Sequence, residues 1–437
     1  MSSEHNSPAS NLFKKLPADI LLLIFEVLAS DGTHLPWPQA QYDINRARAP
    51  FVLAGACSAW RQLALDIPLL WTYLGFPEFR QSLAELELRV SRGKEAPVDV
   101  FFHPNPCEPD SDSASCLALL HAIAGRWRNV SIDYSGAPEN TSFSWLTECA
   151  TPYLQLLRLT SASAKWHDSH LLSLHGVLPH APRLRRFFFD GIATKWTFHN
   201  QTTAKITTVS IWTHDWSAQS LCAFLRQVAE TITTLTLISD GYYAYPTDDV
   251  VVLPNLIRLT LRFPEWLVHI RVPNVDHLEL AWRDLEPSSE PLLEYLSCIN
   301  TLVLWEEHFI PEPRCVQELG RVFTNLTHLK FAVPSAYYAI YGRGALSTVP
   351  KSFLIMLAGV DSAPPVWPCL QRMSFGNDAD PLPQRIDVDV QSLAAMMRRR
   401  QCPTGGTVPL RLHVAPAVEL KELRDLVEQL MCTETEC

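Results

Sequence analysis

The sequence predicts an α/β protein in which an N-terminal helical block precedes a long array of short strands joined by helices and loops. Three observations lead to this expectation. An apolar-x-x-apolar-x-apolar pattern recurs along most of the chain, two strongly apolar segments with helical spacing lie within residues 12–75, and apolar residues make up 47% of the 437 residues. Such a chain can bury a large core, as either about three ordinary domains or one long repetitive one.

Each copy of the recurring pattern predicts one short strand. Its last two apolar residues are separated by one residue, so they point to the same face of a strand. The middle positions of successive copies are 19 to 44 residues apart, and the segment 221–230 between two copies has the apolar spacing of a helix. The copies are Trp127/Val130/Ile132, Leu154/Leu157/Leu159, Leu184/Phe187/Phe189, Ile206/Val209/Ile211, Ile232/Leu235/Leu237, Leu256/Leu259/Leu261, Val275/Leu278/Leu280, Ile299/Leu302/Leu304, Leu326/Leu329/Phe331 and Leu370/Met373/Phe375, with a degenerate last copy at Leu410/Leu412.

One strand per ~20–29 residues, returned by a helix or loop, is typical of a leucine-rich repeat solenoid, with parallel strands on the concave face and helices and loops on the convex face. The usual Asn or Cys after each strand is mostly missing and the spacing is irregular, so the array resembles a degenerate subset of that family. Unrelated βα units in an ordinary α/β domain are the alternative. We expect the array to cover residues 97–416 and a capping helix with a tail to cover 417–437.

The segment 14–28 predicts a helix that must be covered on two sides. Pro17 suits the first turn of a helix, and Asp19 complements the positive end of the helix dipole. From Ile20 to Leu28 the only polar residue is Glu26, so the helix is apolar nearly all round. The second face therefore needs another part of this chain or a different protein.

A second apolar segment, 49–71, completes an ordered set of motifs: Leu-Pro-x-x-Ile, then Cys-x-x-Trp-Arg, then Pro-x-x-Trp. This set resembles the F-box. Extra residues between the two segments, including 33–40, and Ala56 before Cys57 depart from that pattern. We expect a disordered tail at 1–11, an F-box domain at 12–75 with an insertion at about 29–48, and a linker helix at 76–96. The resemblance is carried by Leu16, Pro17, Ile20, Leu21, Ile24, Leu28, Cys57, Trp60, Arg61, Leu63, Pro68, Leu70 and Trp71.

The resemblance implies that the helical block binds a Skp-family adaptor and, through it, a cullin scaffold. The chain would then be the non-catalytic substrate-recognition subunit of a Skp–cullin–F-box type E3 ubiquitin ligase. Two alternatives stay open: the first helix belongs to a private core, and the chain is a leucine-rich repeat scaffold or interaction protein without a role in a ubiquitin ligase. The implied adaptor contacts are Leu16, Pro17, Ile20, Leu21, Ile24, Leu28 and Trp60.

The residues between the buried strand positions are expected to form the surface that binds an unknown protein target. Two of them, Trp212 and Trp305, are large aromatic residues and would be hot spots if exposed. Packing of these two side chains against neighbouring loops is the alternative. The target-binding candidates are Phe188, Trp212, Arg258, Arg262, Trp305 and Lys330.

Charge and motif content exclude several other classes. Lys and Arg number 36 against 46 Asp and Glu, a net charge of −10, which disfavours a general nucleic-acid binder. The apolar run at 20–25 is far shorter than the ~20 residues that span a membrane. Signatures of nucleotide loops, catalytic nucleophiles and zinc proteases are absent, so we expect neither an enzyme nor a cofactor.

Cysteines and histidines give no metal site. The 11 cysteines include no Cys-x-x-Cys pair, which predicts reduced thiols in a cytoplasmic or nuclear protein. The His cluster at His167, His170, His175 and His180 lacks the carboxylate or Cys partners of a metal centre. The run 398–400 is Arg-Arg-Arg, which we interpret as the solvated end of a helix, with a nuclear import signal as the alternative.

Overall fold

The computed structural model divides into two compact units, described separately below. The first comprises residues 1–164 and 180–183, and the second comprises 165–179 and 184–437. The structure describes residues 17–30, 44–76, 83–102, 111–133, 145–160, 172–190, 193–198, 205–213, 218–239, 249–262, 264–281, 296, 298–305, 320–332, 346–349, 351–359, 366–376, 385–401, 409–415 and 418.

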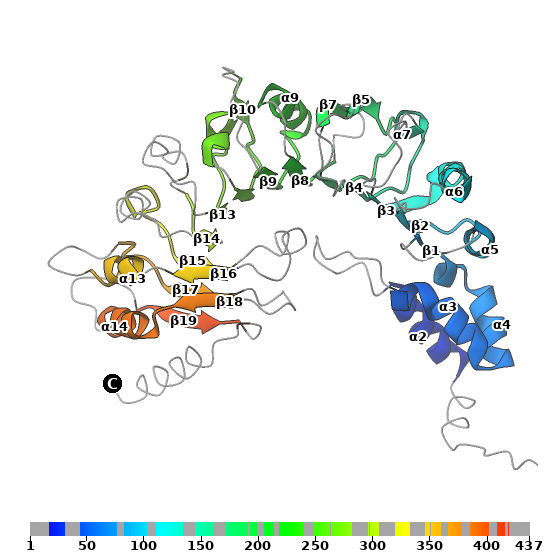
Figure 1. The fold of residues 1–437 in the computed structure, drawn as a ribbon, viewed down its shortest axis with the longest axis horizontal. Coiled ribbons are helices and arrows are strands. Elements are labelled where there is room, and N and C mark those ends of the chain that lie inside the picture. Colours follow the sequence, from blue (N-terminus) through cyan, green and yellow to red (C-terminus); the bar gives the residue numbers. More distant parts are fainter. Residues whose placement is uncertain are drawn as a thin grey trace, which may run out of the picture. The chain divides into compact units, whose positions relative to one another are not determined.

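The first unit joins a helical block to four parallel strands (Figure 1). The strands follow one another in the order β1, β2, β3, β4, and Leu74, Val100, Val130 and Leu157 are direct register partners. Its elements are α2 (Ala18–Ser30), α3 (Ile44–Ala56), α4 (Ser58–Asp66), η1 (Pro68–Trp71), β1 (Tyr73–Phe76), α5 (Leu83–Arg92), β2 (Val98–Phe102), α6 (Ser111–Ala122), η2 (Ala124–Arg126), β3 (Trp127–Asp133), α7 (Trp145–Glu148) and β4 (Leu156–Thr160).

The second unit contributes nine further parallel strands, in the order β6, β8, β9, β11, β13, β14, β15, β17, β19. These strands and the helices among the described residues are β6 (Arg186–Asp190), β8 (Thr208–Thr213), α9 (Ala218–Val228), β9 (Thr234–Ser239), β11 (Arg258–Leu261), η3 (Pro264–Val268), β13 (His277–Ala281), β14 (Thr301–Trp305), β15 (His328–Phe331), α13 (Lys351–Ala358), β17 (Arg372–Phe375), α14 (Val390–Gln401) and β19 (Arg411–Val414). Three short parallel pairs accompany them: β5 (Leu172–Val177) with β7 (Ala193–Phe198), β10 (Val251–Val252) with β12 (Ile270–Arg271), and β16 (Leu346–Val349) with β18 (Arg385–Val388).

The repeated apolar pattern specifies these strands. All eleven copies lie on strands of the parallel order, and the prediction of an α/β protein is confirmed. In the second unit the middle positions Phe187, Val209, Leu235, Leu259, Leu278, Leu302, Leu329 and Met373 are mutual register partners in that order and fully buried. This apolar ladder is the core of the unit.

Helices cover the ladder from its apolar side. Phe224 of α9 packs against Phe187 with ring centroids 5.8 Å apart, and Phe353 of α13 meets Phe331 edge to face at 5.6 Å. The helices expected at 221–230 and from Val390 are confirmed as α9 and α14. The capping helix expected at 417–430 lies outside the described residues, apart from buried Val418.

Two boundaries differ from expectation. The parallel strands begin at Tyr73 and not near residue 97, and α5, expected as a linker, connects the adjacent strands β1 and β2. The apolar pattern is present at Trp71/Leu74/Phe76, but its first residue, Trp71, is also the last residue of the apolar segment 49–71 that we assigned to helix. Within that segment, α3 and α4 are separate helices. The helical conformation is interrupted at Cys57, which has an extended backbone and is the N-cap of α4.

Candidate functional site

One side of α2 builds the core of the helical block. Leu21 and Phe25 are buried on successive turns, and Phe25 meets the Trp60 ring edge to face at 5.6 Å. The Trp71 indole fixes the base of this core by donating a hydrogen bond of 2.8 Å to the Ala64 carbonyl. The core comprises Phe25, Leu53, Ala64, Ile67, Leu70 and Trp71, with Leu22, Ala54, Trp60, Leu63 and Leu65 packed around it.

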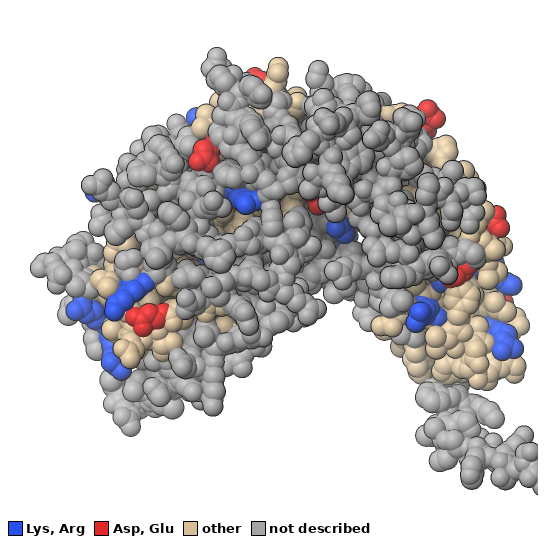
Figure 2. All heavy atoms as spheres, in the orientation of Figure 1, with Lys and Arg blue, Asp and Glu red and all other residues tan. Residues whose placement is uncertain are grey.

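The opposite side of α2 is apolar and exposed. Ile20, Leu23, Ile24 and Val27 retain 43%, 57%, 39% and 51% of their accessible surface. Their spacing of three and four residues places them on one stripe, which we call the α2 face. Figure 2 shows that the visible surface of the α2–α4 region is mostly uncharged. Four adjacent exposed aliphatic side chains on one helix are typical of a surface that binds another protein.

The expected adaptor contacts fall into three groups. Ile20, Ile24 and Pro17 are exposed. Leu16 and the side chain of Leu28 lie outside the described residues. Leu21, expected as an adaptor contact, is instead buried in the core of the block. Successive residues of a helix are rotated by about 100°, so Leu21 points inward while Ile20 points outward.

Trp60 is half-buried, and its ring packs on Phe25 within the block. Leu23 and Val27 were missed, although their spacing from Ile20 was sufficient to find them. The α2 face therefore includes Leu23 and Val27, which the resemblance did not imply, and excludes Leu21, which it did.

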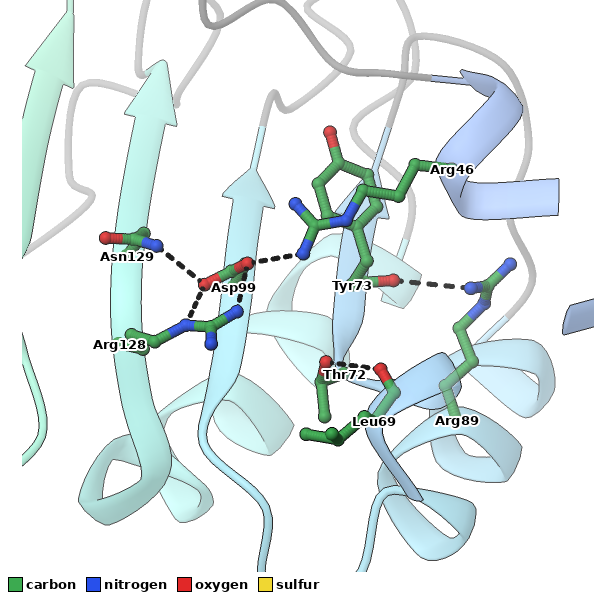
Figure 3. A network of polar contacts seen from close by, with 8 residues as sticks. All are labelled: Arg46, Leu69, Thr72, Tyr73, Arg89, Asp99, Arg128 and Asn129. Atoms are coloured by element: carbon green, nitrogen blue, oxygen red, sulfur yellow. Dashed lines mark hydrogen bonds and ion pairs between the residues drawn. The ribbon is translucent and has the colours of Figure 1, made fainter. Parts of the chain in front are cut away.

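A buried polar network joins the helical block to the strands of the same unit (Figure 3). Asp99 on β2 accepts hydrogen bonds from Arg46 on α3 at 2.8 Å, from Arg128 on β3 at 2.9 and 2.7 Å, and from Asn129 at 2.8 Å. The Arg46 guanidinium also lies over the Tyr73 ring, 4.4 Å from its centroid. The carboxylate is thus satisfied on both oxygens by three side chains from two elements.

A third arginine reinforces this junction. Arg89 on α5 donates to the Ala47 carbonyl at 2.7 Å and to the Tyr73 carbonyl at 3.3 Å. Its carboxylate partner is Glu85, one turn earlier, at 2.8 Å. These bonds link α3, α5 and β1, so the helical block is fixed to its neighbouring strands at several points.

The surroundings of Asp99 keep it ionised. Burial alone would raise its pKa, but the hydrogen bonds and charges of Arg128 and Arg46 lower the pKa below its ordinary value of 3.8. Arg128 responds in the opposite sense, since the hydrogen bond to Asp99 raises its pKa. Breaking such a buried pair leaves an uncompensated charge, so the network is a strong structural constraint.

The second unit presents a different surface, formed by the strand residues between the apolar positions. We call it the polar strand face. Arg258 is exposed, and Arg262 and Lys330 are half-buried, so these three target-binding candidates remain accessible. On β13, Glu279 accepts a hydrogen bond from the Thr260 hydroxyl at 3.1 Å and contacts the His277 ring at 3.0 Å.

The expected exposure of the aromatic candidates is wrong. Trp212 and Trp305 retain only 6% and 3% of their surface, and Phe188 retains 4%. The Trp212 indole nitrogen donates to the Ser210 hydroxyl on its own strand at 3.2 Å. Strand alternation sets the face to which a side chain points, but large rings on strands about 4.8 Å apart can still be covered by their surroundings. These three residues are packed side chains and not exposed hot spots.

Other sequence candidates are placed as follows. His167 and His170 and the side chain of His175 lie outside the described residues, and His180 is exposed. Arg398 and Arg399 are exposed as expected, but Arg400 is buried and donates to the carbonyls of Leu357, Val366 and Trp367. Arg400 therefore holds α14 against α13 and the segment before β17.

The described residues offer neither a metal-binding cluster nor a membrane-spanning helix. They contain no group of three or more His, Cys, Asp or Glu side chains arranged to hold a metal ion. Nor do they include a helix with the length and apolar content to cross a membrane. Comparison of the chain with family models and with curated proteins finds no match.

Proposed function

We propose that the chain is the substrate-recognition subunit of a Skp–cullin–F-box type ubiquitin ligase. The helical block would bind a Skp-family adaptor through the α2 face, and the strand array would bind a protein target. The observation that carries this proposal is the exposed aliphatic stripe Ile20, Leu23, Ile24 and Val27 on a helix whose other side already has a core. Each aliphatic side chain removed from water contributes about 1.5–3 kcal/mol, so the stripe suffices for a tight interface.

The strand array supports the second half of the proposal. We infer that it is a degenerate leucine-rich repeat solenoid, since each copy supplies one parallel strand and the copies stay in register over nine strands of the second unit. Such arrays present one broad strand face to a partner. The polar strand face, with Arg258 and Lys330 accessible, is our candidate for target binding.

Binding to a purified Skp-family adaptor tests the proposal. The full chain should bind the adaptor, and Ile20→Asp/Ile24→Asp should weaken binding roughly thousandfold, because two charges would enter an apolar interface. Leu88→Asp is the matched control, since Leu88 is an equally exposed leucine (41%) on α5. It should leave adaptor affinity unchanged.

Thermal denaturation of the parent, the double variant and the control variant checks that all three are equally folded. A loss of affinity with an unchanged thermal transition is then a loss of binding and not of structure. Adaptor affinity that is equal for the parent and the double variant would remove the α2 face from the proposal. Absence of any adaptor binding by the folded parent would favour the alternative, a repeat scaffold without a role in a ubiquitin ligase.

A further inference from the structure

The first residues of six neighbouring strands form a basic row on the polar strand face. Direct register pairing runs along this row from β11 to β19. Three arginines in it are exposed, and none of the six residues is acidic. The row consists of Arg258, His277, Thr301, His328, Arg372 and Arg411.

Little negative charge lies beside this row on the same strands. Two residues further along each strand, on the same face, come Thr260, Glu279, Val303, Lys330, Ser374 and His413. Glu279 is the only carboxylate among the residues of these six strands, and it is engaged by His277 and Thr260. Among the residues that the structure describes, Arg258, Arg372 and Arg411 form no ion pair. The row is thus a basic region in a chain of net charge −10.

His328 responds to this local excess of positive charge. Burial lowers its pKa first, and the nearby Arg372, Lys330, His277 and His413 lower it further, to about 4. Its ring stays neutral at neutral pH and contacts the Ser374 hydroxyl at 2.8 Å. A bound anion would offset the positive charge of Arg372 and Lys330 beside this ring.

The spacing of the row fits an extended polypeptide. Neighbouring strands lie about 4.8 Å apart, so six strands span about 24 Å, the length of about seven extended residues. Guanidinium groups present paired N–H donors whose geometry matches carboxylate and phosphate oxygens. The row therefore offers anchoring points along one line and not a single pocket, with Arg258 four strands away from the neighbouring pair Arg372 and Arg411.

We propose that this basic row binds an extended anionic segment of the target protein, in which carboxylates or phosphates meet Arg258, Arg372 and Arg411. The inference rests on the proposed function, because it names the class of segment that the receptor recognises. A single-stranded nucleic acid is the competing anion, but binding of that kind uses exposed aromatic side chains on which bases stack. Trp212 and Trp305 of this unit are buried.

Fluorescence anisotropy with the full chain tests the inference. The probes are three labelled decapeptides of one sequence, in which four positions carry Glu, phosphoserine or Gln, and a single-stranded oligonucleotide. The parent should bind the Glu or the phosphoserine peptide at least tenfold more tightly than the Gln peptide, and added salt should weaken that binding. Whichever anionic peptide binds better identifies carboxylate or phosphate as the preferred group.

Substitution of the row then locates the binding site. Arg372→Gln/Arg411→Gln should weaken binding of the anionic peptide by about tenfold or more, whereas Arg398→Gln, an exposed arginine on α14, should not change it. Equal binding of the three peptides, tighter binding of the oligonucleotide, or an undiminished affinity of the folded double variant would each overturn the inference. Adaptor binding by the same variants is measured separately, so the adaptor proposal can fail while this one stands, and the reverse.

Discussion

Helix α2 and the strands of the second unit differ in how far they bury aliphatic side chains. The strands of the ladder from β6 to β17 bury their middle apolar positions completely, as Leu235, Leu259 and Leu278 show. On α2, by contrast, Ile20, Leu23, Ile24 and Val27 stay exposed although the helix is equally apolar. The strand array covers its apolar side by pairing copies with one another and by packing helices on them. Among the described residues, α2 is covered on only one side. The difference teaches that a helix as apolar as these strands can keep one aliphatic side exposed, and this exposed side is the basis of the proposed adaptor binding.

The largest expected effect concerns the charged junction of the first unit. Asp99→Asn should destabilise that unit by about 3–5 kcal/mol, because Arg46 and Arg128 would lose their shared carboxylate in a buried setting. Asp249→Asn is the matched control, since its pair with Arg226 at 2.7 Å is solvent-accessible and contributes about 0–1 kcal/mol. Urea unfolding of both variants measures the difference, and equal losses would contradict a special role for the network.

The aliphatic comparison itself can be tested with two leucines. Leu259→Ala should cost about 2–5 kcal/mol, because it leaves a cavity in the fully buried ladder. Leu23→Ala should change stability by no more than about 0.5 kcal/mol, since its side chain is 57% exposed. Thermal or urea denaturation checks both, and a large loss for Leu23→Ala would mean that the α2 face already has a cover within the chain.

The two units should respond to acid in different pH ranges. His328 has a folded pKa lowered to about 4 from an ordinary value of 6.5, so the unfolded chain takes up a proton there first. The second unit should therefore lose stability as pH falls from about 7 to 4. The full shift corresponds to about 3 kcal/mol, and solvent screening of a half-buried ring reduces it to on the order of 1–2 kcal/mol.

Asp99 contributes in a lower range, because its folded pKa lies below 3.8 and its stabilisation is lost only as pH falls through that value. Urea midpoints between pH 7 and 3 separate the two contributions. His328→Gln should flatten the upper part of the profile and leave the lower part unchanged. An unchanged upper slope in this variant would contradict the assignment to His328.

The smallest expected effect concerns the polar strand face. Thr260 lies between two buried strand positions, yet it retains only 8% of its surface and donates a hydrogen bond to Glu279. Thr260→Val, which keeps the shape and removes the hydroxyl, should cost about 1 kcal/mol. Thr260→Ser keeps the donor and should cost less, and the reverse order in urea unfolding would contradict a role for the hydrogen bond.

The strands were predictable because their signal is local. A one-residue alternation identifies the buried positions of each copy, and all eleven copies became strands. Exposure on the other face was not predictable in the same way, since strand alternation gives the direction of Trp212 and Trp305 but not their burial. The Asp99 network was equally invisible, because Arg46, Asp99 and Arg128 are separated by 53 and 29 residues. Within α2 the sequence identified Ile20 and Ile24 of the exposed stripe, but it missed Leu23 and Val27 and did not predict the burial of Leu21.

The Asp99 network also determines how the helical block could be recombined or grafted. A truncation after residue 75 would match the boundary expected for the F-box domain. It would, however, leave Arg46 without the Asp99 carboxylate and the Ala47 carbonyl without the Arg89 donor. A cut after residue 133 would keep β2 and β3, and therefore Asp99 and all three side chains that donate to it. The helical block therefore cannot be transferred alone, and a chimera that exchanges the strands of the second unit should keep residues 17–133 together.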